Sequence, residues 1–595
     1  MPLRIEEYGL IGDCQTSALV GSDGSVDWLC FPYFDCGACF AALLGNEKNG
    51  RWLLAPADEA VTTRSYRGDS LILETTHRTA GGEVTVIDFM PPRGAEPDLV
   101  RIVVGRRGQV RMKMDLIIRF DYGSVVPWVR RIERGILAVA GPDTLTLHTP
   151  VELRGQNLTT VAEFTVSEGE QVPFVLTWHP SHEPEPQEID AQGALQFTED
   201  WWRQWSGQCT FEGPWRDAVM RSLITLKALT FSPTGGIVAA ATTSLPEHLG
   251  GVRNWDYRYC WLRDATFTLY SLLVTGYTEE AKAWRDWLLR AVAGDPSTLQ
   301  IMYSITGARR LTELELGWLA GYENSRPVRI GNAASGQFQL DVYGEVLDML
   351  HVCRREGLPE DEHSWRLQHA MLEFLETGWK KADEGIWEVR GPRRDFTHSK
   401  VMSWVAFDRA VKAVECFGRE GSADRWRKLR DEVHEEVCRE GFNEQIGSFV
   451  QFYGSDELDA SLLMAPLVGF LPASDPRVQG TVKAIQRGLM RDGFVDRYAP
   501  KPHVDGLPPG EGSFLPCSFW LADNLALMGR RDEALELFQR LLDVRNDLGL
   551  LSEEYDPIAR RLVGNFPQAF SHIGLVNTAR NLVAHEGPAE LRQHD

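Results

Sequence analysis

The stretch Ser422-Ala-Asp-Arg-Trp-Arg-Lys-Leu-Arg-Asp-Glu-Val-His-Glu-Glu-Val-Cys-Arg-Glu-Gly441 shows the pattern that dominates the second part of this chain. Ser422 stands at an N-cap position and Gly441 at the position of a C-cap glycine. The apolar residues between them recur at helical spacing, which places them on one face: Trp426, Leu429, Val433 and Val437. The pattern predicts an amphipathic helix over residues 422–440.

Similar helical blocks follow one another from about Pro214, which itself suits the first turn of a helix. We expect helices near 214–231, 264–275, 278–292, 338–355, 363–377, 398–417, 422–440, 459–470, 476–490, 515–529, 531–545 and 567–584. Twelve helices without intervening strands suit an (α/α)6 barrel with six inner and six outer helices. A helical solenoid fits the same count almost as well.

The first two hundred residues show the alternation typical of β-strands instead of helical spacing. Residues 71–78 and 83–89 show partial alternation around a Thr-Ala-Gly-Gly turn, which predicts a β-hairpin. Similar strand patterns recur at 100–104, 110–118, 136–140 and 145–148. We therefore predict a multidomain protein: an antiparallel β-sandwich over 1–196, a linker helix over 197–213 and an all-α barrel over 214–595.

Composition narrows the class of ligand. The chain has 595 residues and a net charge of -22, so anionic partners such as nucleic acid and membrane surfaces are disfavoured. Nineteen tryptophans suit either a large core or aromatic walls around a neutral, ring-shaped ligand. Because the sequence shows neither a signal peptide nor a membrane span, we expect a cytoplasmic protein. The oligomeric state is left open.

The ten cysteines fit reduced thiols in that compartment. Cys36-Gly-Ala-Cys39 has the spacing of a redox motif, but no βαβ pattern follows it and no second pair completes a zinc site. We interpret it as a buried turn, and the sequence predicts no metal site and no cofactor.

Three short segments carry groups suited to chemistry. In Asp256-Tyr-Arg-Tyr-Cys-Trp-Leu-Arg-Asp264, Arg263 and Asp264 can hydrogen-bond to vicinal hydroxyls, while Tyr257, Tyr259 and Trp261 offer ring faces. The alternative is that an Arg-Asp pair of this segment only pins a loop.

The other two segments supply separate carboxyl groups. In Gly385-Ile-Trp-Glu-Val-Arg390, Glu388 follows Trp387, and an apolar flank raises the pKa of a carboxyl group as a general acid requires. In Leu551-Ser-Glu-Glu-Tyr555, Glu553 is a candidate base, although the segment could equally be a solvated turn or a helix cap.

Taken in order along the chain, these motifs resemble glycoside hydrolase family 15, the glucoamylases and their bacterial trehalase-like relatives. The opening segment from Tyr8 to Trp28 is similar to the β-sandwich domain of the bacterial members. The tyrosine-rich Arg-Asp motif, the Trp-Glu pair, the Ser-Glu pair and the segment Gly331–Asp341 follow in the family's order.

The resemblance implies an inverting exo-α-glucosidase with a small-molecule carbohydrate substrate. Glu388 would be the general acid, Glu553 the general base that activates water, and Tyr257 would help to orient that water. The remaining substrate-binding residues that it implies are Trp261, Arg263, Asp264, Trp387 and Arg497.

The sequence also departs from the family pattern. Glucoamylases commonly carry a second acid directly after the catalytic one, where this chain has Val389, so starch-type recognition is in doubt. Glucoamylases also carry an acid soon after the residue that matches Arg497, and this chain lacks it. Glu554 adjoins Glu553, and spacing alone does not choose between them.

The sequence leaves three hypotheses for the function, of which an α-glucoside hydrolase is the first. Trehalose is the first expected substrate, with maltose, isomaltose and short α-glucans close behind. The second possibility is a disaccharide phosphorylase, which would need no base in the place of Glu553. The third is a sugar-binding protein without activity, which would need no pair of separately placed acids.

Overall fold

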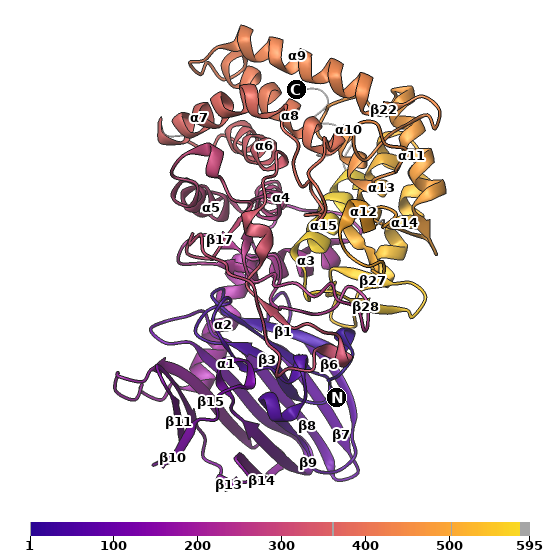
Figure 1. The fold of residues 1–595 in the computed structure, drawn as a ribbon. Coiled ribbons are helices and arrows are strands. Elements are labelled where there is room, and N and C mark those ends of the chain that lie inside the picture. Colours follow the sequence, from indigo (N-terminus) through magenta and orange to yellow (C-terminus); the bar gives the residue numbers. More distant parts are fainter. Residues whose placement is uncertain (1, 360–361, 501, 584–595) are drawn as a thin grey trace.

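The computed structural model describes residues 2–359, 362–500 and 502–583, which form a β domain and a helical domain (Figure 1). The β domain consists of two antiparallel sheets that share β9 (Asp98–Ile117). One sheet contains β1 (Tyr8–Gly12), β2 (Ser17–Gly21), β3 (Ser25–Cys30), β4 (Ala38–Phe40), β5 (Arg51–Pro56), β13 (Arg154–Gln156) and β14 (Thr159–Ser167). The other contains β6 (Val61–Tyr66), β7 (Leu73–Thr79), β8 (Gly82–Phe89), β10 (Trp128–Ile132), β11 (Gly135–Ala140), β12 (Asp143–His148) and β15 (Gln171–Pro180).

Strand β9 crosses from one sheet to the other. Its first half pairs with β8 and β15, and its second half pairs with β5 and β14. The crossing lies at Gly105 and Gly108, where a Cβ on Gly105 would lie 2.0 Å from the Ser167 carbonyl oxygen and where Gly108 has a φ of 61°. The two strands predicted over 100–104 and 110–118 are therefore one strand, bent where glycine permits it.

The helical domain is an (α/α)6 barrel. Within the described residues, the inner layer contains α4 (Leu262–Leu273), α6 (Asp341–Arg355), α8 (Thr397–Glu415), α10 (Met464–Leu467), α13 (Leu515–Leu527) and α15 (Ala569–Val583). The outer layer contains α3 (Arg216–Ala228), α5 (Thr278–Ala291), α7 (Glu362–Gly378), α9 (Ala423–Glu440), α11 (Pro476–Gly488) and α14 (Arg531–Asp543). Each inner helix contacts the next, and α15 returns to contact α4 (Figure 1). The solenoid alternative is wrong, because its two ends would not meet.

The burial of side chains separates the two layers. Helix α8 is buried on nearly every position from Thr397 to Ala413, whereas α9 buries only Trp426, Val433 and Val437. An inner helix must be apolar or internally paired all round, and an outer helix needs only one apolar face. The inner helix predicted over 459–470 is the shortest: a 3₁₀ turn over Ala460–Leu463 leads into α10.

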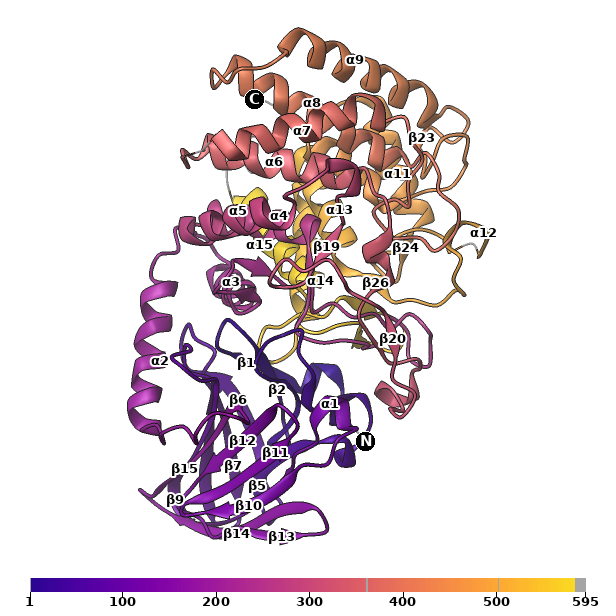
Figure 2. The same ribbon diagram turned by 60° about the vertical axis from the view of Figure 1, so that its left-hand side comes forward.

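Helix α2 (Ala191–Ser206) connects the domains and runs beside both of them in Figure 2. It begins before the linker helix predicted over 197–213, because the Asp190 side chain accepts hydrogen bonds from the backbone N–H groups of Gln192 and Gly193 and caps the helix there. The final part of the predicted barrel, 584–595, lies outside the described residues. No helix in the described part of the chain has the length and apolar character needed to cross a membrane.

Candidate active site

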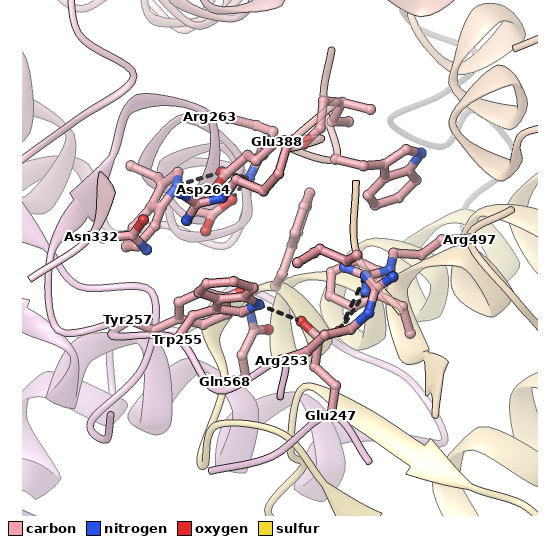
Figure 3. Close-up of a pocket in the computed structure, with 17 residues that line it drawn as sticks. Glu247, Arg253, Trp255, Tyr257, Arg263, Asp264, Asn332, Glu388, Arg497 and Gln568 are labelled. Carbon is pink, nitrogen blue, oxygen red and sulfur yellow. Dashed lines mark hydrogen bonds and ion pairs between the residues drawn. The ribbon is translucent and has the colours of Figure 1, made fainter. Parts of the chain in front are cut away.

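A cavity opens at the end of the barrel where the loops that lead into the inner helices converge (Figure 3). It is lined by Glu247, Arg253, Trp255, Tyr257, Trp261, Arg263, Asp264, Asn332, Ile386, Trp387, Glu388, Arg390, Arg497, Leu507, Phe514, Gln568 and Phe570. The N-terminal end of an α-helix carries roughly half a positive charge, so this end of the barrel favours carboxylates. Most of the cavity wall is aromatic or charged, which suits a ligand with apolar ring faces and many hydroxyl groups.

Glu388 is held rigidly in the cavity wall. Its Oε1 atom accepts a hydrogen bond of 2.7 Å from Trp261 Nε1, and Arg263 Nη2 lies 3.5 Å away. Burial raises the pKa of the Glu388 carboxyl, and Arg263 partly opposes that rise. A buried carboxyl whose pKa is raised keeps its proton at higher pH, which is the property of a proton donor.

Arg263 and Asp264 lie beside Glu388, at the start of α4. Arg263 Nε is 3.1 Å from Asp264 Oδ1, and Arg263 Nη1 donates to the Ile386 carbonyl oxygen at 2.8 Å. The neighbouring Trp387 is fixed through its Nε1, which donates to Asp459 Oδ1 at 2.9 Å. The structure thus brings five of the predicted site residues, Trp261, Arg263, Asp264, Trp387 and Glu388, into the lining of one cavity.

Glu553 lies deeper, and it is fully buried. Its Oε2 atom accepts a hydrogen bond of 3.0 Å from the backbone N–H of Asn565, whereas its Oε1 atom is buried without a hydrogen-bond partner in the described structure. The Tyr257 side chain lies close enough to lower the pKa of this carboxyl. Gly564 makes the position possible, since a Cβ there would lie 2.7 Å from Glu553 Oε2. Burial first, and then the charge of Glu247, raises the pKa of Glu553 to about 8.

Tyr257 links the two carboxyls. Its side chain, which lines the cavity, interacts electrostatically with Glu553, Glu247 and Glu388. In Figure 3, Glu388 and Tyr257 lie on facing walls of the cavity. Glu553 itself does not line the cavity in the described structure, whereas Tyr257, which interacts electrostatically with it, does.

Arg497 lines the cavity and is the centre of a buried charge cluster. Its Nη2 atom lies 2.8 Å from Glu247, 2.5 Å from Glu511 and 3.4 Å from Glu554. Arg253 also pairs with Glu511, at 3.3 Å. This is the group of acidic side chains that could otherwise hold a metal ion, since their oxygens lie within 4.8 Å of one another. A guanidinium nitrogen already stands among these oxygens, so the group does not fit a metal.

The sequence interpretation missed several residues of the cavity. Glu247, Arg253 and Trp255 precede the quoted Arg-Asp motif, and Gln568 lies at the start of α15. Glu247 accepts from Trp255 Nε1 at 3.0 Å as well as from Arg497. No local pattern between Glu247 and Trp255 marks these residues, because Glu247 and Arg253 pair with side chains 250 or more positions away.

The position after Glu388 faces away from the cavity. The Val389 side chain is buried, with 1% of its surface exposed. Arg390 lines the cavity instead, 4.8 Å above the Trp255 ring and 3.4 Å from Glu313. A cation therefore stands near the place where glucoamylases carry an acid.

The β domain supports the site through Arg258. Arg258 pairs with Asp256 at 2.7 Å and donates to the carbonyl oxygen of Cys36 at 2.9 Å. The loop-pinning alternative thus describes Asp256 and Arg258, whereas Arg263 and Asp264 face the cavity. Cys36 and Cys39 are free thiols. Their turn supplies a carbonyl group that fixes the residue next to Tyr257.

A closed (α/α)6 barrel that holds two buried carboxyls around an aromatic pocket has the architecture of an enzyme that cleaves glycosidic bonds. Residues 213–580 match the model of the glycosyl hydrolases family 15, and residues 1–202 match that of the trehalase-like N-terminal domain. The chain belongs to glycoside hydrolase family 15, and it is a glycoside hydrolase, as the sequence motifs predicted.

Known proteins resemble the chain along nearly its whole length. A trehalase of Mycolicibacterium smegmatis is 40% identical and aligns over 98% of this chain and 92% of its own length. A trehalase of Thermoplasma acidophilum is 35% identical over 95% of this chain and 98% of its own. The crystal structure of a bacterial glucoamylase in complex with acarbose superposes with a TM-score of 0.73 at 12% identity and covers 98% of this chain and 94% of its own, which supports the fold.

The raised pKa of Glu553 predicts a stability effect. Between the ordinary glutamate pKa of about 4.3 and the folded-state pKa, the folded protein keeps a proton that the unfolded chain releases, so stability falls as pH rises through this window. Glu553→Gln removes that pH-dependent loss while keeping an oxygen to accept from Asn565. The thermal unfolding midpoint of the variant should exceed that of the wild type by an amount that grows between about pH 5 and about pH 8.

Midpoints measured by calorimetry across this range test the prediction. The exposed Glu435 supplies the control, and Glu435→Gln should leave the midpoint within experimental error of the wild type at each pH. A difference between Glu553→Gln and the wild type that is constant with pH would contradict the account.

Proposed function

We propose that this protein is a trehalase that hydrolyses α,α-trehalose with inversion at the attacked anomeric carbon. The observation that carries the proposal is the placement of Glu388 in one wall and of Tyr257, which interacts electrostatically with the buried Glu553, in the facing wall. An inverting glycosidase needs a protonated carboxyl at the leaving oxygen and an ionised carboxyl that activates water on the opposite face of the sugar. Trehalases that align with nearly the whole chain support the choice of substrate.

In this proposal, Glu388 protonates the glycosidic oxygen. Its raised pKa keeps the proton in place before reaction, and the Trp261 hydrogen bond aims the carboxyl. Arg263 and Asp264 hold hydroxyl groups of the glucose that is attacked, and Trp387 supplies a ring face. Proton donation by a fixed carboxyl lowers the barrier to departure of the second glucose.

Glu553 removes a proton from the attacking water, which Tyr257 orients. The ionised form of Glu553 is favoured by the hydrogen bond from Asn565, by the charge of Arg497 and by the neighbouring Tyr257 side chain, all of which lower its pKa against the effect of burial. Glu554 cannot take this role in the same way, because its carboxyl belongs to the Arg497 cluster. We therefore assign the base to Glu553, and we assign to Arg497 the joint role of glucose contact and cluster centre.

The second-sugar site is proposed to be small and to favour a disaccharide over a starch chain. Val389 points into the protein, and Arg390 and Trp255 form the wall on that side. A buried base in the place of Glu553 also disfavours the phosphorylase alternative, in which phosphate would replace it. We place the protein in the cytoplasm, which the ten free cysteines support.

Initial rates on trehalose, isomaltose, maltose and maltoheptaose, with and without phosphate, test the substrate. We expect trehalose to be hydrolysed fastest and maltoheptaose poorly, because the cavity offers no acid after Glu388 to hold a second glucan unit. A strong preference for maltoheptaose would contradict the proposal, and glucose 1-phosphate among the products would indicate a phosphorylase.

Substitution of the two glutamates tests their roles. Glu388→Gln and Glu553→Gln should each lower kcat on trehalose by about 10²–10⁴-fold. α-Glucosyl fluoride, whose leaving group needs no proton, should still be turned over by Glu388→Gln but not by Glu553→Gln.

The adjacent acid is the matched control for the base. Glu554→Gln should be much milder than Glu553→Gln when kcat is measured on both substrates. If Glu554→Gln is the more damaging of the two, the base has been assigned to the wrong residue.

A further inference from the structure

The backbone at Glu388 is held in an unusual conformation. Its φ is 57°, in the left-handed region that residues with a Cβ avoid. Such conformations persist only where surrounding contacts enforce them, and they cluster at functional sites. The contacts that enforce this one therefore also decide where the carboxyl of Glu388 points.

Gln337 supplies those contacts on the side away from the cavity. Its Nε2 atom donates to the Glu388 carbonyl oxygen at 3.1 Å and to the Val389 carbonyl oxygen at 3.2 Å. Carbonyl oxygens only accept hydrogen bonds, so the amide nitrogen must face them. Gln339 Nε2 donates to Gln337 Oε1 at 3.0 Å, which fixes the same orientation from the other end.

The Glu388 carbonyl follows the ψ torsion of Glu388, so the first of these hydrogen bonds fixes that torsion, and the second fixes the ψ torsion of Val389. The peptide before Glu388 is held separately, because the Glu388 N–H donates to the Gly385 carbonyl oxygen at 3.1 Å. At its other end, the Glu388 carboxyl has one short hydrogen bond, from Trp261. We propose that Gln337 is a positioning residue for proton donation: its hydrogen bond to the Glu388 carbonyl, supported by the one to the Val389 carbonyl, holds Glu388 in the left-handed conformation from which its carboxyl reaches the glycosidic oxygen. This inference rests on the role proposed above for Glu388.

The loop should remain folded without Gln337. Phe338 N donates to Glu384 Oε2 at 2.9 Å, and Leu340 N donates to Asp383 Oδ2 at 2.9 Å, so the same two segments stay connected. In the described structure Gln337 does not line the cavity. Its loss should therefore act on the direction of Glu388 and not on the binding of sugar.

The test compares Gln337→Met, which keeps the length of the side chain and removes both donors, with the wild type. We expect kcat on trehalose to fall about 10-fold or more, since a small misplacement of a catalytic group costs up to 10²-fold, while KM changes by less than about twofold. Turnover of α-glucosyl fluoride should stay close to that of the wild type. Gln337→Glu has the same shape but presents an oxygen to the two carbonyls. It should show the same loss of kcat on trehalose and the same near-normal turnover of α-glucosyl fluoride.

Gln300 offers a matched control. Its Nε2 also donates to two backbone carbonyl oxygens, those of Arg309 at 3.0 Å and Ser335 at 3.1 Å, and neither belongs to the Glu388 loop. Because Ser335 lies two residues before Gln337, this control disturbs the same segment without removing the hydrogen bonds to Glu388 and Val389. Gln300→Met removes the same kind of contact and should leave kcat on both substrates close to the wild-type values. A purely structural role for Gln337 would make the two glutamine variants behave alike.

Two results would overturn the inference: an equal loss on trehalose and glucosyl fluoride in Gln337→Met, or no difference between Gln337→Met and Gln300→Met. Glu388→Gln, measured alongside, reports separately on the proposed function. If Glu388→Gln loses both substrates equally, the acid role itself is wrong. If Glu388→Gln still turns over glucosyl fluoride while Gln337→Met changes the turnover of neither substrate, only the positioning role is wrong.

Discussion

The contact of α15 with α4 closes the inner ring of helices, and the site depends on that closure. Glu388 precedes α8, and Glu553 precedes α15, so the two carboxyls belong to loops that are far apart along the chain. A ring of parallel inner helices gathers the loops before all of them at one end. Without closure, Tyr257 could not interact with both carboxyls at once.

The gathered loops place ionisable groups where water is largely excluded. Burial is the largest cause of the raised pKa values of Glu388, Glu553 and Asp264, and arginines oppose it in each case. Buried charges are tolerated when they are paired, and here the acidic side chains of the site pair with Arg263 and Arg497. The site is therefore a place where stability is lost in return for buried carboxyl groups that can exchange protons. The β domain contributes through Arg258, which joins its turn at Cys36 to the loop that carries Tyr257.

Local patterns in the sequence predicted the fold and one wall of the site. The helical blocks could be predicted because apolar residues recur in them at helical spacing, and the Trp-Glu and Ser-Glu segments because an aromatic or small residue adjoins a carboxyl. The remainder depends on partners that no local pattern contains. Arg497 meets Glu247 across 250 positions, and Gln337 meets the Glu388 carbonyl across 51, so neither role is visible before the chain folds. Strand β9 was predicted as two strands, over 100–104 and 110–118, whereas the glycines between them bend a single strand that serves both sheets.

The central claim is that two carboxyls act from opposite sides of the glycosidic bond without a covalent intermediate. Proton NMR of the first glucose released from α,α-trehalose tests it directly, before the anomers interconvert. Inversion predicts equal amounts of α- and β-glucose, because the attacked ring inverts and the departing ring keeps its configuration. Only α-glucose in the first product would mean that configuration is retained, with Glu553 as a nucleophile, and would contradict the account.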